Sequence, residues 1–484
     1  MIVLVGFMGA GKSSAARDIA ADAGAEPLDA DELVAERLGM PIPEFFARHG
    51  EEAFRRREEE LVLELLRRDG AVLALGGGAV ESPRVREALR AHRVVLLDVD
   101  AETAWSRVRH SDRPLARDRG AFAALHARRR PLYEEVADLV VPAVRGAALR
   151  AVAAVPEGAR GVWARTAGGE YPVVVGRGVR HHAPEGGFVV TDSGVPRQWA
   201  PDPDHVLEAG ERNKTLAAAE GLWRAMARAG VTRAGHVRAV GGGVVTDLAG
   251  FCAATYQRGV PVVHVPTTLL GMVDAAIGGK TGVDLPEAKN YVGAYHQPLA
   301  VLADLDTLST LPPAQLAEGY AEVVKTALIA GGALWERVAG GADPDEAVIF
   351  ACARTKVAVV EEDERDGGRR QVLNLGHTVA HAIETTTGYA LTHGQAVGLG
   401  LLAALRLSGR QALRDDVAAL LAAHGLPTRH EALDVDAVVA ATRRDKKRTG
   451  EDVPFVLVAA PGDVRHGQAV EEADLRAAVE ELRR

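Results

Sequence analysis

A phosphate-loop motif at residues 6–13, GFMGAGKS, is the feature that most restricts what this chain can fold into. It satisfies the pattern G-x-x-x-x-G-K-[ST], follows the apolar run MIVLV and opens a helical pattern from Lys12 to Ala23. Such a loop needs a buried strand before it and a helix N-terminus after it, because backbone N–H groups of the turn cradle phosphates. Lys12 would reach the β- and γ-phosphates of a nucleotide, and Ser13 would bind Mg²⁺. The motif therefore predicts an α/β nucleotide-binding unit.

Hydrophobic patterning divides the chain into three units and a short linker. Its 484 residues suffice for two to four domains. Residues 1–155 alternate Val/Leu-rich runs with helical periods, which predict helices at 12–23, 51–68, 101–108 and 122–133. That alternation is typical of a parallel sheet covered by helices on both faces. Residues 156–161 have the character of a linker, and residues 162–310 predict a second, Rossmann-like α/β unit that opens on a hairpin. Residues 311–484 follow helical periods, which predicts an all-α unit that would hold a metal.

Composition excludes several classes of protein. The net charge of −9 gives no general attraction for nucleic acid, and no apolar run approaches the roughly 18–20 residues of a membrane span. A basic run at residues 443–448, RRDKKR, would suit nucleic acid, but it lacks interleaved aromatic residues. The two cysteines, Cys252 and Cys352, fit a reducing compartment. We therefore expect a cytoplasmic enzyme that acts on small molecules and has no nucleic-acid or membrane partner.

Lysine is scarce, and the places where it remains are informative. Only eight of the 57 basic residues are lysine, and asparagine occurs three times. Arginine would serve wherever an exposed positive charge is sufficient, so a retained lysine marks a place where a compact ammonium group is needed. The lysines are Lys12, Lys214, Lys280, Lys289, Lys325, Lys356, Lys446 and Lys447, and the asparagines are Asn213, Asn290 and Asn374.

Polar residues that follow the phosphate loop indicate a small anionic acceptor. Asp29 and Asp31 come after the first helix at a distance suited to a metal ion and an acceptor. Three glycines at 76–78 follow the strand pattern AVLAL, so a small ligand could approach the backbone closely there. Arginines occur at position 55, in a polar loop at 113 and in the segment RRRPLY at 128–133. Singly, each would be a solvated charge, but together they suit bidentate binding of an anion.

Residues 1 to about 150 resemble shikimate kinase. The resemblance rests on the phosphate loop, the D-x-D pair, the Phe54-Arg55 helix, the GGG turn, the R-P-L lid and the R-x-P-L-Y segment. Gluconate and adenylate kinases share the loop but are expected to lack the GGG turn and the R-x-P-L-Y segment. The resemblance implies ATP as co-substrate and Mg²⁺ as cofactor. It places Gly9, Ala10, Gly11, Lys12, Ser13, Ser14 and Arg113 on ATP, Ser13 and Asp29 near Mg²⁺, and Asp31, Arg55, Gly77 and Arg129 on shikimate, with Asp31 and Lys12 catalytic.

A second ligand site is indicated between residues 211 and 290. The glycines of GGG (241–243) follow the strand pattern HVRAV and would let a pyrophosphate approach the backbone. The segments ERNK (211–214) and PTT (266–268) strengthen this dinucleotide signal. Further on, GGK (278–280) and KN (289–290) place ammonium groups beside glycine or asparagine, an arrangement suited to a phosphorylated, hydroxyl-rich substrate.

Histidines and a glutamate in the helical part indicate a metal site. Glu322 and Lys325 share one helix face at i, i+3, and His377 and His381 share another at i, i+4. His393 follows within 17 residues of His377. One Glu and two His form an open Zn²⁺ site with room for substrate oxygens. Spacing alone favours His377 and His381 as the histidine pair.

Residues 162–484 resemble 3-dehydroquinate synthase along nearly their whole length. The matching segments are GGGVVTDLAGFCAATYQRG, VPTTLLGMVDAAIGGKTGVD, KNYVGAYHQP, the E-x-x-K helix, LNLGHT, HGQAV and RDKK. The resemblance implies NAD⁺ and Zn²⁺ or Co²⁺ as cofactors and is compatible with a homodimer through this half. It implies that the metal is bound by Glu322, His377 and His393, and NAD by Glu211, Lys214, Gly243, Asp247, Thr267, Thr268, Lys280 and Lys289. It implies that the substrate is bound by Arg258, Asp274, Lys289, Asn290, Lys325, Lys356, Arg370, Asn374, His381 and Lys447. The catalytic residues that it implies are Lys280, Lys325, Lys356, Asn374 and His381.

The chain departs from this family at two positions. Gly194 stands where the family usually has Asn in the nucleotide pocket, and Asp366 stands where Glu is common. Both departures change individual contacts to the bound molecules and leave the expected reaction the same. For the metal ligands, we follow the resemblance rather than the His377–His381 spacing.

The two resemblances together imply a bifunctional enzyme of the shikimate pathway. One half would phosphorylate shikimate to shikimate 3-phosphate with ATP. The other, a carbon–oxygen lyase, would convert 3-deoxy-D-arabino-heptulosonate 7-phosphate into 3-dehydroquinate and phosphate. Three alternatives stay open: a kinase fused to another sugar-phosphate cyclase, a metal-dependent alcohol dehydrogenase-like oxidoreductase in the second half, and a non-catalytic nucleotide-sensing module. An oxidoreductase would release NADH, whereas a synthase would not.

The scarcity of lysine generates the first prediction. Replacing Lys12, Lys280, Lys325 or Lys356 by Arg is expected to lower the corresponding activity at least ~100-fold, about 2.7 kcal/mol, because the planar guanidinium cannot occupy the site of an ammonium group. The fold should survive, since charge is retained. Steady-state kinetics on the four variants test this, with circular dichroism as the control for folding. Near-wild-type rates in three of the four would mean that lysine scarcity carries no functional information.

Overall fold

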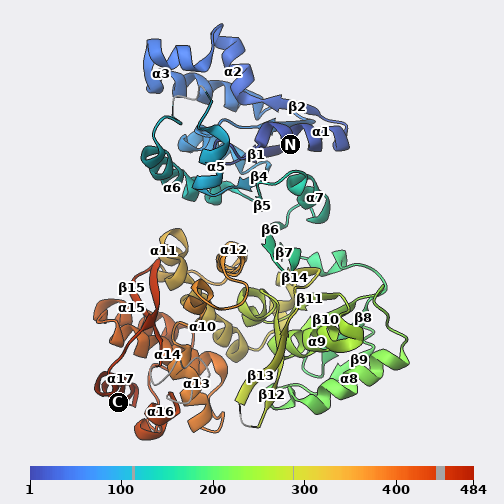
Figure 1. Ribbon diagram of the computed structural model, residues 1–484. Helices are drawn as coiled ribbons and strands as arrows, with labels where there is room; N and C mark the ends of the chain where they lie inside the picture. Colours follow the sequence, from blue (N-terminus) through green and yellow to red (C-terminus); the bar gives the residue numbers. More distant parts are fainter. Residues whose placement is uncertain (112–114, 287, 443–452, 484) are drawn as a thin grey trace. The chain divides into compact units, whose positions relative to one another are not determined.

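The apolar run ahead of the phosphate loop forms strand β1 (Ile2–Val5), an inner strand of a parallel sheet in the computed structural model (Figure 1). The structure describes residues 1–484 except 112–114, 287, 443–452 and 484. It divides into two units, Met1–Trp163 and Ala164–Arg484.

The sheet of the first unit has the strand order β2-β3-β1-β4-β5, and β5 also pairs with residues 161 and 162 of β6. Every pairing in it is parallel. Val3 and Val95 are fully buried, because parallel strands covered on both faces need apolar side chains on each. The strands other than β1 are β2 (Glu26–Asp29), β3 (Ala71–Ala74), β4 (Arg93–Asp98), β5 (Leu139–Pro142) and β6 (Arg160–Thr166).

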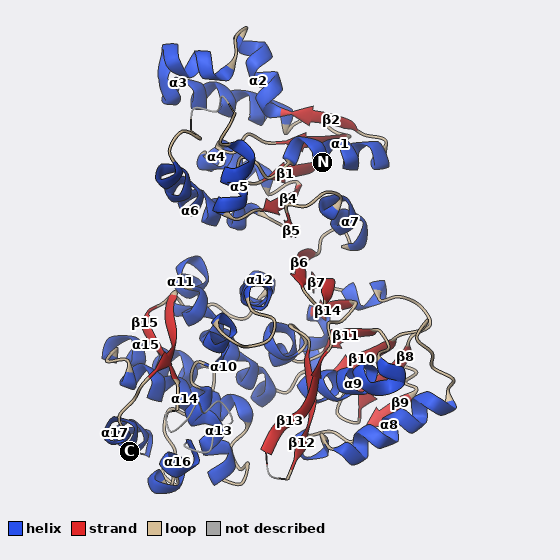
Figure 2. Cartoon of the chain, in the orientation of Figure 1, coloured by secondary structure: helices blue, strands red, loops and turns tan. Residues whose placement is uncertain are grey.

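Only some of the helices of the first unit, which Figure 2 shows in blue, were expected from the sequence. The helices predicted at 12–23 and 101–108 are confirmed. The helix predicted from residue 51 begins earlier, at Ile42, and is bent at Gly50, whose φ of 79° is not helical. The helices are α1 (Lys12–Ala23), α2 (Ala30–Leu38), α3 (Ile42–Leu65), α4 (Pro83–Leu89), α5 (Ala101–Val108), α6 (Arg119–Val136) and α7 (Ala147–Ala154), with the short turn η1 (Ala79–Glu81).

The second unit opens with another parallel sheet, of order β7-β14-β11-β10-β8-β9. Helix α9 contacts β10 and β11, and the antiparallel hairpin β12–β13 contacts α9. The elements are β7 (Gly169–Gly176), β8 (Phe188–Asp192), β9 (His205–Leu207), α8 (Leu216–Arg228), β10 (Val237–Gly241), α9 (Gly243–Thr255), β11 (Val262–Pro266), β12 (Lys280–Leu285), β13 (Ala288–Tyr295) and β14 (Ala300–Asp304), with short turns η2 (Val179–His182), η3 (Glu211–Asn213), η4 (Tyr256–Arg258), η5 (Gly271–Ala275) and η6 (Leu305–Thr310).

The C-terminal part is helical, as predicted, with one added hairpin. Helix α14 lies at its centre and contacts α10, α13, α15 and α17. Strands β15 and β16 form an antiparallel hairpin that the helical prediction missed. The elements are α10 (Pro313–Ala330), α11 (Gly332–Ala339), α12 (Glu346–Glu362), η7 (Arg369–Asn374), α13 (His377–Thr386), α14 (His393–Leu407), α15 (Gln411–Ala423), α16 (Val435–Thr442), β15 (Phe455–Ala460), β16 (Asp463–Gln468) and α17 (Glu472–Arg483).

Glycines allow α13 and α14 to pack without a gap between them. Gly376 precedes α13 with φ 77°, and its carbonyl oxygen would lie 2.1 Å from a Cβ placed on Gly400 of α14. No side chain fits between them. This contact fixes where the first residue of α13, His377, lies against α14.

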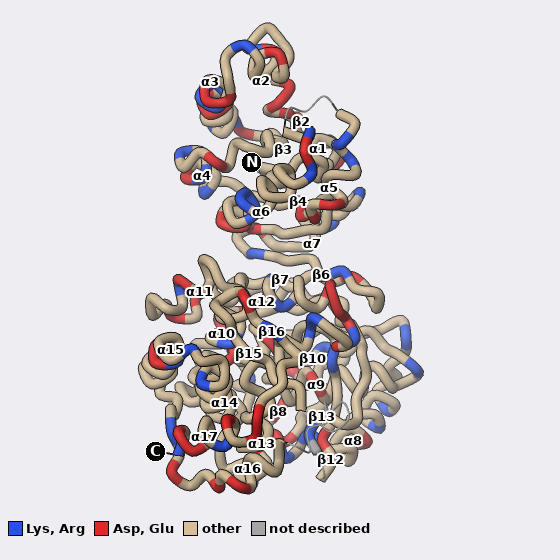
Figure 3. The backbone as a smooth tube through the Cα atoms, turned by 60° about the vertical axis from the view of Figure 1, so that its left-hand side comes forward, with Lys and Arg blue, Asp and Glu red and all other residues tan. Residues whose placement is uncertain are grey.

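Charged residues of both signs are interspersed along the surface helices, as on α3 in Figure 3. On that helix Arg56 pairs with Glu52 at 2.8 Å and Arg57 with Glu60 at 3.1 Å, all largely exposed. Most arginines of this kind are solvated surface charges that contribute little to stability. Among the described residues, no helix is both long and apolar enough to cross a membrane.

The close contact of α13 and α14 generates a prediction on stability. Gly400→Ala is expected to destabilise the second unit by about 1–3 kcal/mol, because overpacking forces the two helices apart. Gly398→Ala on the same helix is the matched control, since its Cβ would lie 3.4 Å from Leu421 Cδ1, an ordinary contact. Urea unfolding followed by circular dichroism measures both. Equal midpoints for the two variants would contradict the argument.

Candidate functional sites

The phosphate loop of the first unit presents open backbone donors. The loop joins β1 to α1, and Gly9 and Gly11 adopt φ values of 86° and 88° that other residues rarely reach. Among the residues that the structure describes, no side chain caps the N-terminus of α1, so its N–H groups are available to an anion. Lys12 Nζ donates to the carbonyl oxygens of Gly6 at 2.9 Å and Phe7 at 3.3 Å. The ammonium group therefore lies along the loop where phosphates would bind.

The glycine turn after β3 lies directly against this loop. A Cβ on Gly77 would lie 3.5 Å from the backbone nitrogen of Met8. A Cβ on Gly76 would lie 2.4 Å from Glu58 Oε1 and 2.6 Å from Asp31 Oδ1, so both carboxylates point at the turn. The turn thus brings the predicted acceptor residue Asp31 close to the phosphate loop.

Two arginines predicted on the acceptor are held by carboxylates that sequence reasoning missed. Arg55 donates to Glu58 Oε2 at 2.6 Å, and Arg129 donates to Glu81 Oε2 at 2.8 Å. Arg129 is only 1% exposed and Glu58 3%. Burial raises the pKa of Glu58, against the opposing effect of Arg55. The Arg55–Glu58 spacing of i, i+3 on a helix was a readable signal for one of these pairs.

Other predicted residues of the first unit have defined places. Tyr133 lies four residues after Arg129 on α6 and donates to Gly77 O at 2.5 Å, which braces the glycine turn. Asp29 Oδ1 accepts from the backbone N–H of Asp31 at 2.9 Å and so caps α2. Arg113 lies outside the described residues.

In the second unit, Glu322, His377 and His393 converge. One ligand atom from each lies within 4.8 Å of the others, and no other group of three such residues meets this criterion in the described part of the chain. His377 Nε2 lies 3.5 Å and His393 Nε2 3.4 Å from Glu322 Oε1. Both histidines open a helix, α13 and α14, while Glu322 projects from α10.

Local packing brings these three helices together. A Cβ on Gly394 would lie 2.3 Å from Glu318 Cα, so α14 begins in direct contact with α10 one turn before Glu322. His377 Nδ1 lies 3.1 Å from Leu375 O, which leaves Nε2 facing the centre of the cluster. His381, which spacing favoured as a metal ligand, is not part of the cluster, and its ring centre lies 5.5 Å from that of His377.

The charges of the cluster fit a divalent cation. Glu322 is fully buried, and neither oxygen has a well-directed hydrogen bond in the described structure, although Lys325 and both histidines lie close. Burial would raise the pKa of Glu322, but Lys325 and the histidines hold it well below its usual range. A buried anion with free lone pairs beside two imidazole nitrogens is a donor set suited to Zn²⁺ or Co²⁺.

Lysines predicted on the substrate surround Asp274 of η5. Lys325 Nζ lies 3.0 Å from Asp274 Oδ2, and Lys356 Nζ contacts Oδ1. Burial lowers the pKa of Lys356, against the effect of Asp274. Lys280 pairs with Asp366 at 2.6 Å, and Asp366 has φ 62°. The ammonium groups around Asp274 lie close to the metal cluster, since Lys325 also contacts Glu322.

The glycine turn after β10 offers a dinucleotide site. Gly242 is the N-cap of α9, and no side chain in the described part of the chain caps that helix, so its first N–H groups are open to a phosphate. A Cβ on Gly242 would lie 3.1 Å from Thr268 Cγ2, so the turn leaves room only for backbone. Thr267 and Thr268 follow β11, the neighbour of β10. The crevice at the carboxyl ends of parallel strands is where such folds bind nucleotides, and NAD⁺ fits here.

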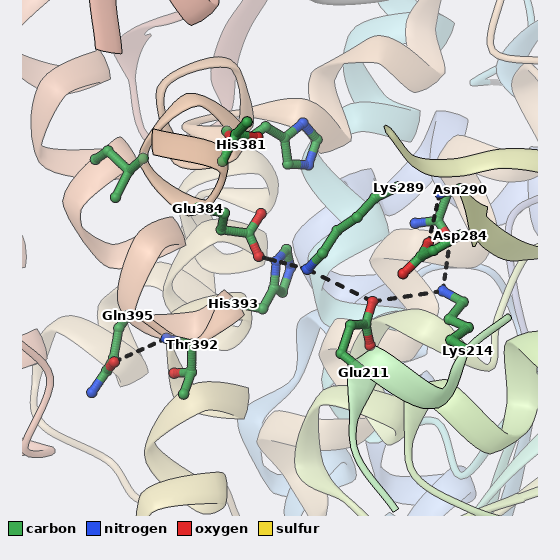
Figure 4. Close-up of polar contacts among 12 residues, drawn as sticks. Glu211, Lys214, Asp284, Lys289, Asn290, His381, Glu384, Thr392, His393 and Gln395 are labelled. Carbon is green, nitrogen blue, oxygen red and sulfur yellow. Dashed lines mark hydrogen bonds and ion pairs between the residues drawn. The ribbon is translucent and has the colours of Figure 1, made fainter. Parts of the chain in front are cut away.

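A charged network joins this side to the metal side (Figure 4). Lys214, 3% exposed in its side chain, donates to Asp247 Oδ2 and Asn290 Oδ1, both at 2.6 Å. Lys289 Nζ lies 3.7 Å from Glu211 Oε1 and 3.0 Å from Glu384 Oε1. Glu384 was not among the predicted residues.

Some predicted residues are not brought into this network. Arg258 is exposed and makes no hydrogen bond or ion pair with the other site residues that the structure describes. Arg370 is buried and donates to Gly278 O at 2.9 Å and Glu364 O at 2.6 Å, which braces the turn before Lys280. Asn374 ends η7 beside α13. Lys447 and the basic run at 443–448 lie outside the described residues.

These sites define a P-loop kinase joined to a metal- and dinucleotide-dependent synthase. The chain belongs to the 3-dehydroquinate synthase family: the models described as 3-dehydroquinate synthase N-terminal and C-terminal match residues 204–318 and 319–448. The model described as shikimate kinase matches residues 8–155. The chain is thus a fusion of these two kinds of enzyme.

Similar proteins cover mainly the second half. A 3-dehydroquinate synthase of Symbiobacterium thermophilum is 40% identical over 353 residues, 65% of this chain and 98% of that protein. One of Caulobacter vibrioides is 44% identical over 291 residues, 56% and 79% of the two chains. Among solved structures, 2-deoxy-scyllo-inosose synthase with carbaglucose-6-phosphate, NAD⁺ and Co²⁺ has TM-score 0.60 at 26% identity, covering 66% of this chain and 99% of that one. ValA, a 2-epi-5-epi-valiolone synthase from Streptomyces hygroscopicus subsp. jinggangensis with NAD⁺ and Zn²⁺, has TM-score 0.59 at 27% identity, covering 64% and 96%.

Proposed function

We propose that the chain carries two enzyme activities of the shikimate pathway, one in each unit. The first is phosphorylation of shikimate by ATP to give shikimate 3-phosphate. The second is conversion of 3-deoxy-D-arabino-heptulosonate 7-phosphate into 3-dehydroquinate and phosphate. The observation that carries this proposal is that two sets of residues converge, a phosphate loop against a carboxylate–arginine cluster and a Glu-His-His cluster against buried lysines.

In the kinase unit, the residues bind and orient two anionic substrates. The α1 N-terminus and Lys12 would neutralise the ATP phosphates, with Gly9, Ala10, Gly11 and Ser14 lining the loop. Lys12 gives up its carbonyl partners Gly6 and Phe7 to do so. Asp31 would accept a hydrogen bond from the attacked hydroxyl and take its proton. Mg²⁺ would be held by Ser13 and Asp29, shikimate by Arg55, Arg129 and the backbone of Gly77, and the transferred phosphoryl by Arg113.

In the synthase unit, two cofactors complement the chain's own groups. Glu322, His377 and His393 would hold Zn²⁺ or Co²⁺, which supplies a Lewis acid, and NAD⁺ supplies a reversible hydride acceptor. NAD⁺ would be held by Glu211, Lys214, Gly243, Asp247, Thr267, Thr268, Lys280 and Lys289.

The chain's own residues then bind the heptulosonate phosphate and move its protons. The buried ammonium groups of Lys325 and Lys356, paired with Asp274, neutralise substrate oxygens and hold Asp274 ready as a hydrogen-bond acceptor. His381 and Asn374 would lie at the leaving phosphate and exchange a proton or hydrogen bond with it. The remaining substrate contacts would come from Arg258, Lys289, Asn290, Arg370 and Lys447.

The main alternative is that the second half is another sugar-phosphate cyclase, since it is similar to solved structures of two other synthases, 2-deoxy-scyllo-inosose synthase and ValA. The higher identity to 3-dehydroquinate synthases, 40–44% against 26–27%, favours the proposed substrate. Phosphate release from the heptulosonate phosphate with catalytic NAD⁺ tests it. Accumulation of NADH would instead indicate an alcohol dehydrogenase-like reaction.

We also propose a cytoplasmic homodimer in which residues 156–161 link a kinase half (1–155) to the α/β (162–310) and helical (311–484) parts of the synthase. The reduced, buried Cys252 and Cys352 support a reducing compartment. Sedimentation of the full chain measures its oligomeric state.

The two activities are expected to be separable. Lys12→Met should abolish shikimate phosphorylation, with a loss of roughly 3 kcal/mol or more of transition-state stabilisation, and leave dehydroquinate formation near wild type. Arg17→Met, an exposed cation on the same helix, is the matched control and should leave both activities intact. Coupled assays of both reactions measure this. Loss of both activities in folded Lys12→Met protein would refute independent sites.

Metal is expected to bind tightly only in the second half. His377→Ala should lose one tightly bound divalent ion per chain and keep kinase activity on added Mg²⁺, because a ligand nitrogen is removed from the cluster alone. His381→Ala should retain the ion but lose turnover. Elemental analysis of both variants decides between them. If His381→Ala protein contained no metal, His377 and His381 would be the histidine ligands, as helical spacing favoured.

A further inference from the structure

Glu384 is a buried carboxylate that none of the roles above uses. It lies on α13, 2% exposed, three residues after His381 and seven after His377, and its side chain lies beside His393 and Lys289 (Figure 4). Its position is fixed by the end of the helix, because its carbonyl oxygen accepts the backbone N–H of Tyr389 at 2.8 Å. Tyr389 has φ 62°, so the chain turns sharply there.

The ring of His393 spans two carboxylates. Its Nε2 lies 3.4 Å from Glu322 Oε1, and its Nδ1 lies 3.4 Å from Glu384 Oε1. A histidine ligand is oriented by the acceptor on its second nitrogen, which also selects the tautomer that leaves the other nitrogen free for the metal. For His377 that acceptor is the backbone oxygen of Leu375. Glu384 Oε1 is the carboxylate oxygen that lies beside the corresponding nitrogen of His393.

The same carboxylate holds a lysine from a different part of the unit. Lys289 of β13 places Nζ 3.0 Å from Glu384 Oε1 and 4.7 Å from the centre of the Tyr389 ring. A buried carboxylate needs such a cation, because an unpaired buried charge is costly. Glu384 Oε2 is buried without a hydrogen-bond partner among the described residues. The carboxylate therefore has acceptor capacity for both Lys289 and the Nδ1–H of His393.

We propose that Glu384 is a positioning residue that links the metal site to Lys289. It accepts the Nδ1–H of His393, which aims Nε2 at the metal, and it anchors Lys289 on the dinucleotide side. Metal affinity and the placement of Lys289 thus depend on one carboxylate. This inference rests on the proposed metal site of Glu322, His377 and His393.

The test measures zinc affinity of the full chain by competition with a chromophoric chelator, without turnover. Glu384→Gln keeps the shape and removes the charge, and it is expected to weaken Zn²⁺ binding roughly 10- to 100-fold. Thr385→Val is the matched control on the same helix, because its hydroxyl donates to the backbone oxygen of His381 at 2.9 Å and contacts no residue of the metal cluster among those described. Its Zn²⁺ affinity should stay within about twofold of wild type.

A double-mutant cycle tests the link to Lys289. Lys289→Met is expected to change Zn²⁺ affinity in the wild-type background and to leave it unchanged in the Glu384→Gln background, since the two residues act through one contact. Equal effects in both backgrounds would remove Lys289 from the proposal.

Two further outcomes keep the test decisive. If Glu384→Gln does not fold, Glu384→Asp retains the charge, withdraws the carboxylate by one methylene and should show a smaller loss of affinity. Zn²⁺ affinity within twofold of wild type in a folded Glu384 variant would overturn the inference. Wild-type protein that binds no Zn²⁺ would instead overturn the proposed metal site.

Discussion

The buried charge of Glu322 governs how the second unit is assembled. An ion taken out of water costs several kcal/mol, so this carboxylate is tolerable only where cations or strong donors surround it. Lys325 comes from the same helix, but His377 and His393 must be carried in by two others. The close contacts at Gly376, Gly394 and Gly400 follow from that requirement, because any side chain there would move a histidine away.

In the first unit, buried charges are likewise held by partners of opposite sign, but here the buried groups are arginines of the proposed kinase site. Arg129 is almost completely buried and is held by Glu81, and Arg55 is held by Glu58. Each guanidinium is therefore oriented before an anion arrives, so binding requires little reordering of long side chains. A carboxylate holds each of these arginines in place, from the same helix for Arg55 and from a separate element for Arg129.

Local signals in the sequence were enough to predict most of the elements. The helices at 12–23 and 101–108 were predicted to the residue, since each has a clear start and an apolar stripe. The convergence of Glu322 with two histidines was expected from a family resemblance, whereas spacing pointed to His381. Helical spacing shows only which residues share a face of one helix. It cannot show that His393 of α14, rather than His381 of α13, lies beside Glu322 and His377.

The partners of the binding residues were the part that sequence could not supply. Glu384 and Lys289 are 95 residues apart, and Arg129 and Glu81 are 48 apart. The sequence around a glutamate does not identify its ion-pair partner when the two residues are brought together only by the fold. The hairpins β12–β13 and β15–β16 were missed for a related reason, because their stability comes from packing on helices rather than from a strong alternating pattern.

The two units are parts of one polypeptide chain, and the boundary between them falls at Trp163 and Ala164. Every molecule made therefore contains one site of each kind, whatever the level of expression. The two reactions are not consecutive, so the link does not by itself pass a product from one site to the other. What it fixes is molar ratio: the balance of flux between the two steps can be tuned only through the turnover and affinity of each site, never through the relative abundance of two proteins.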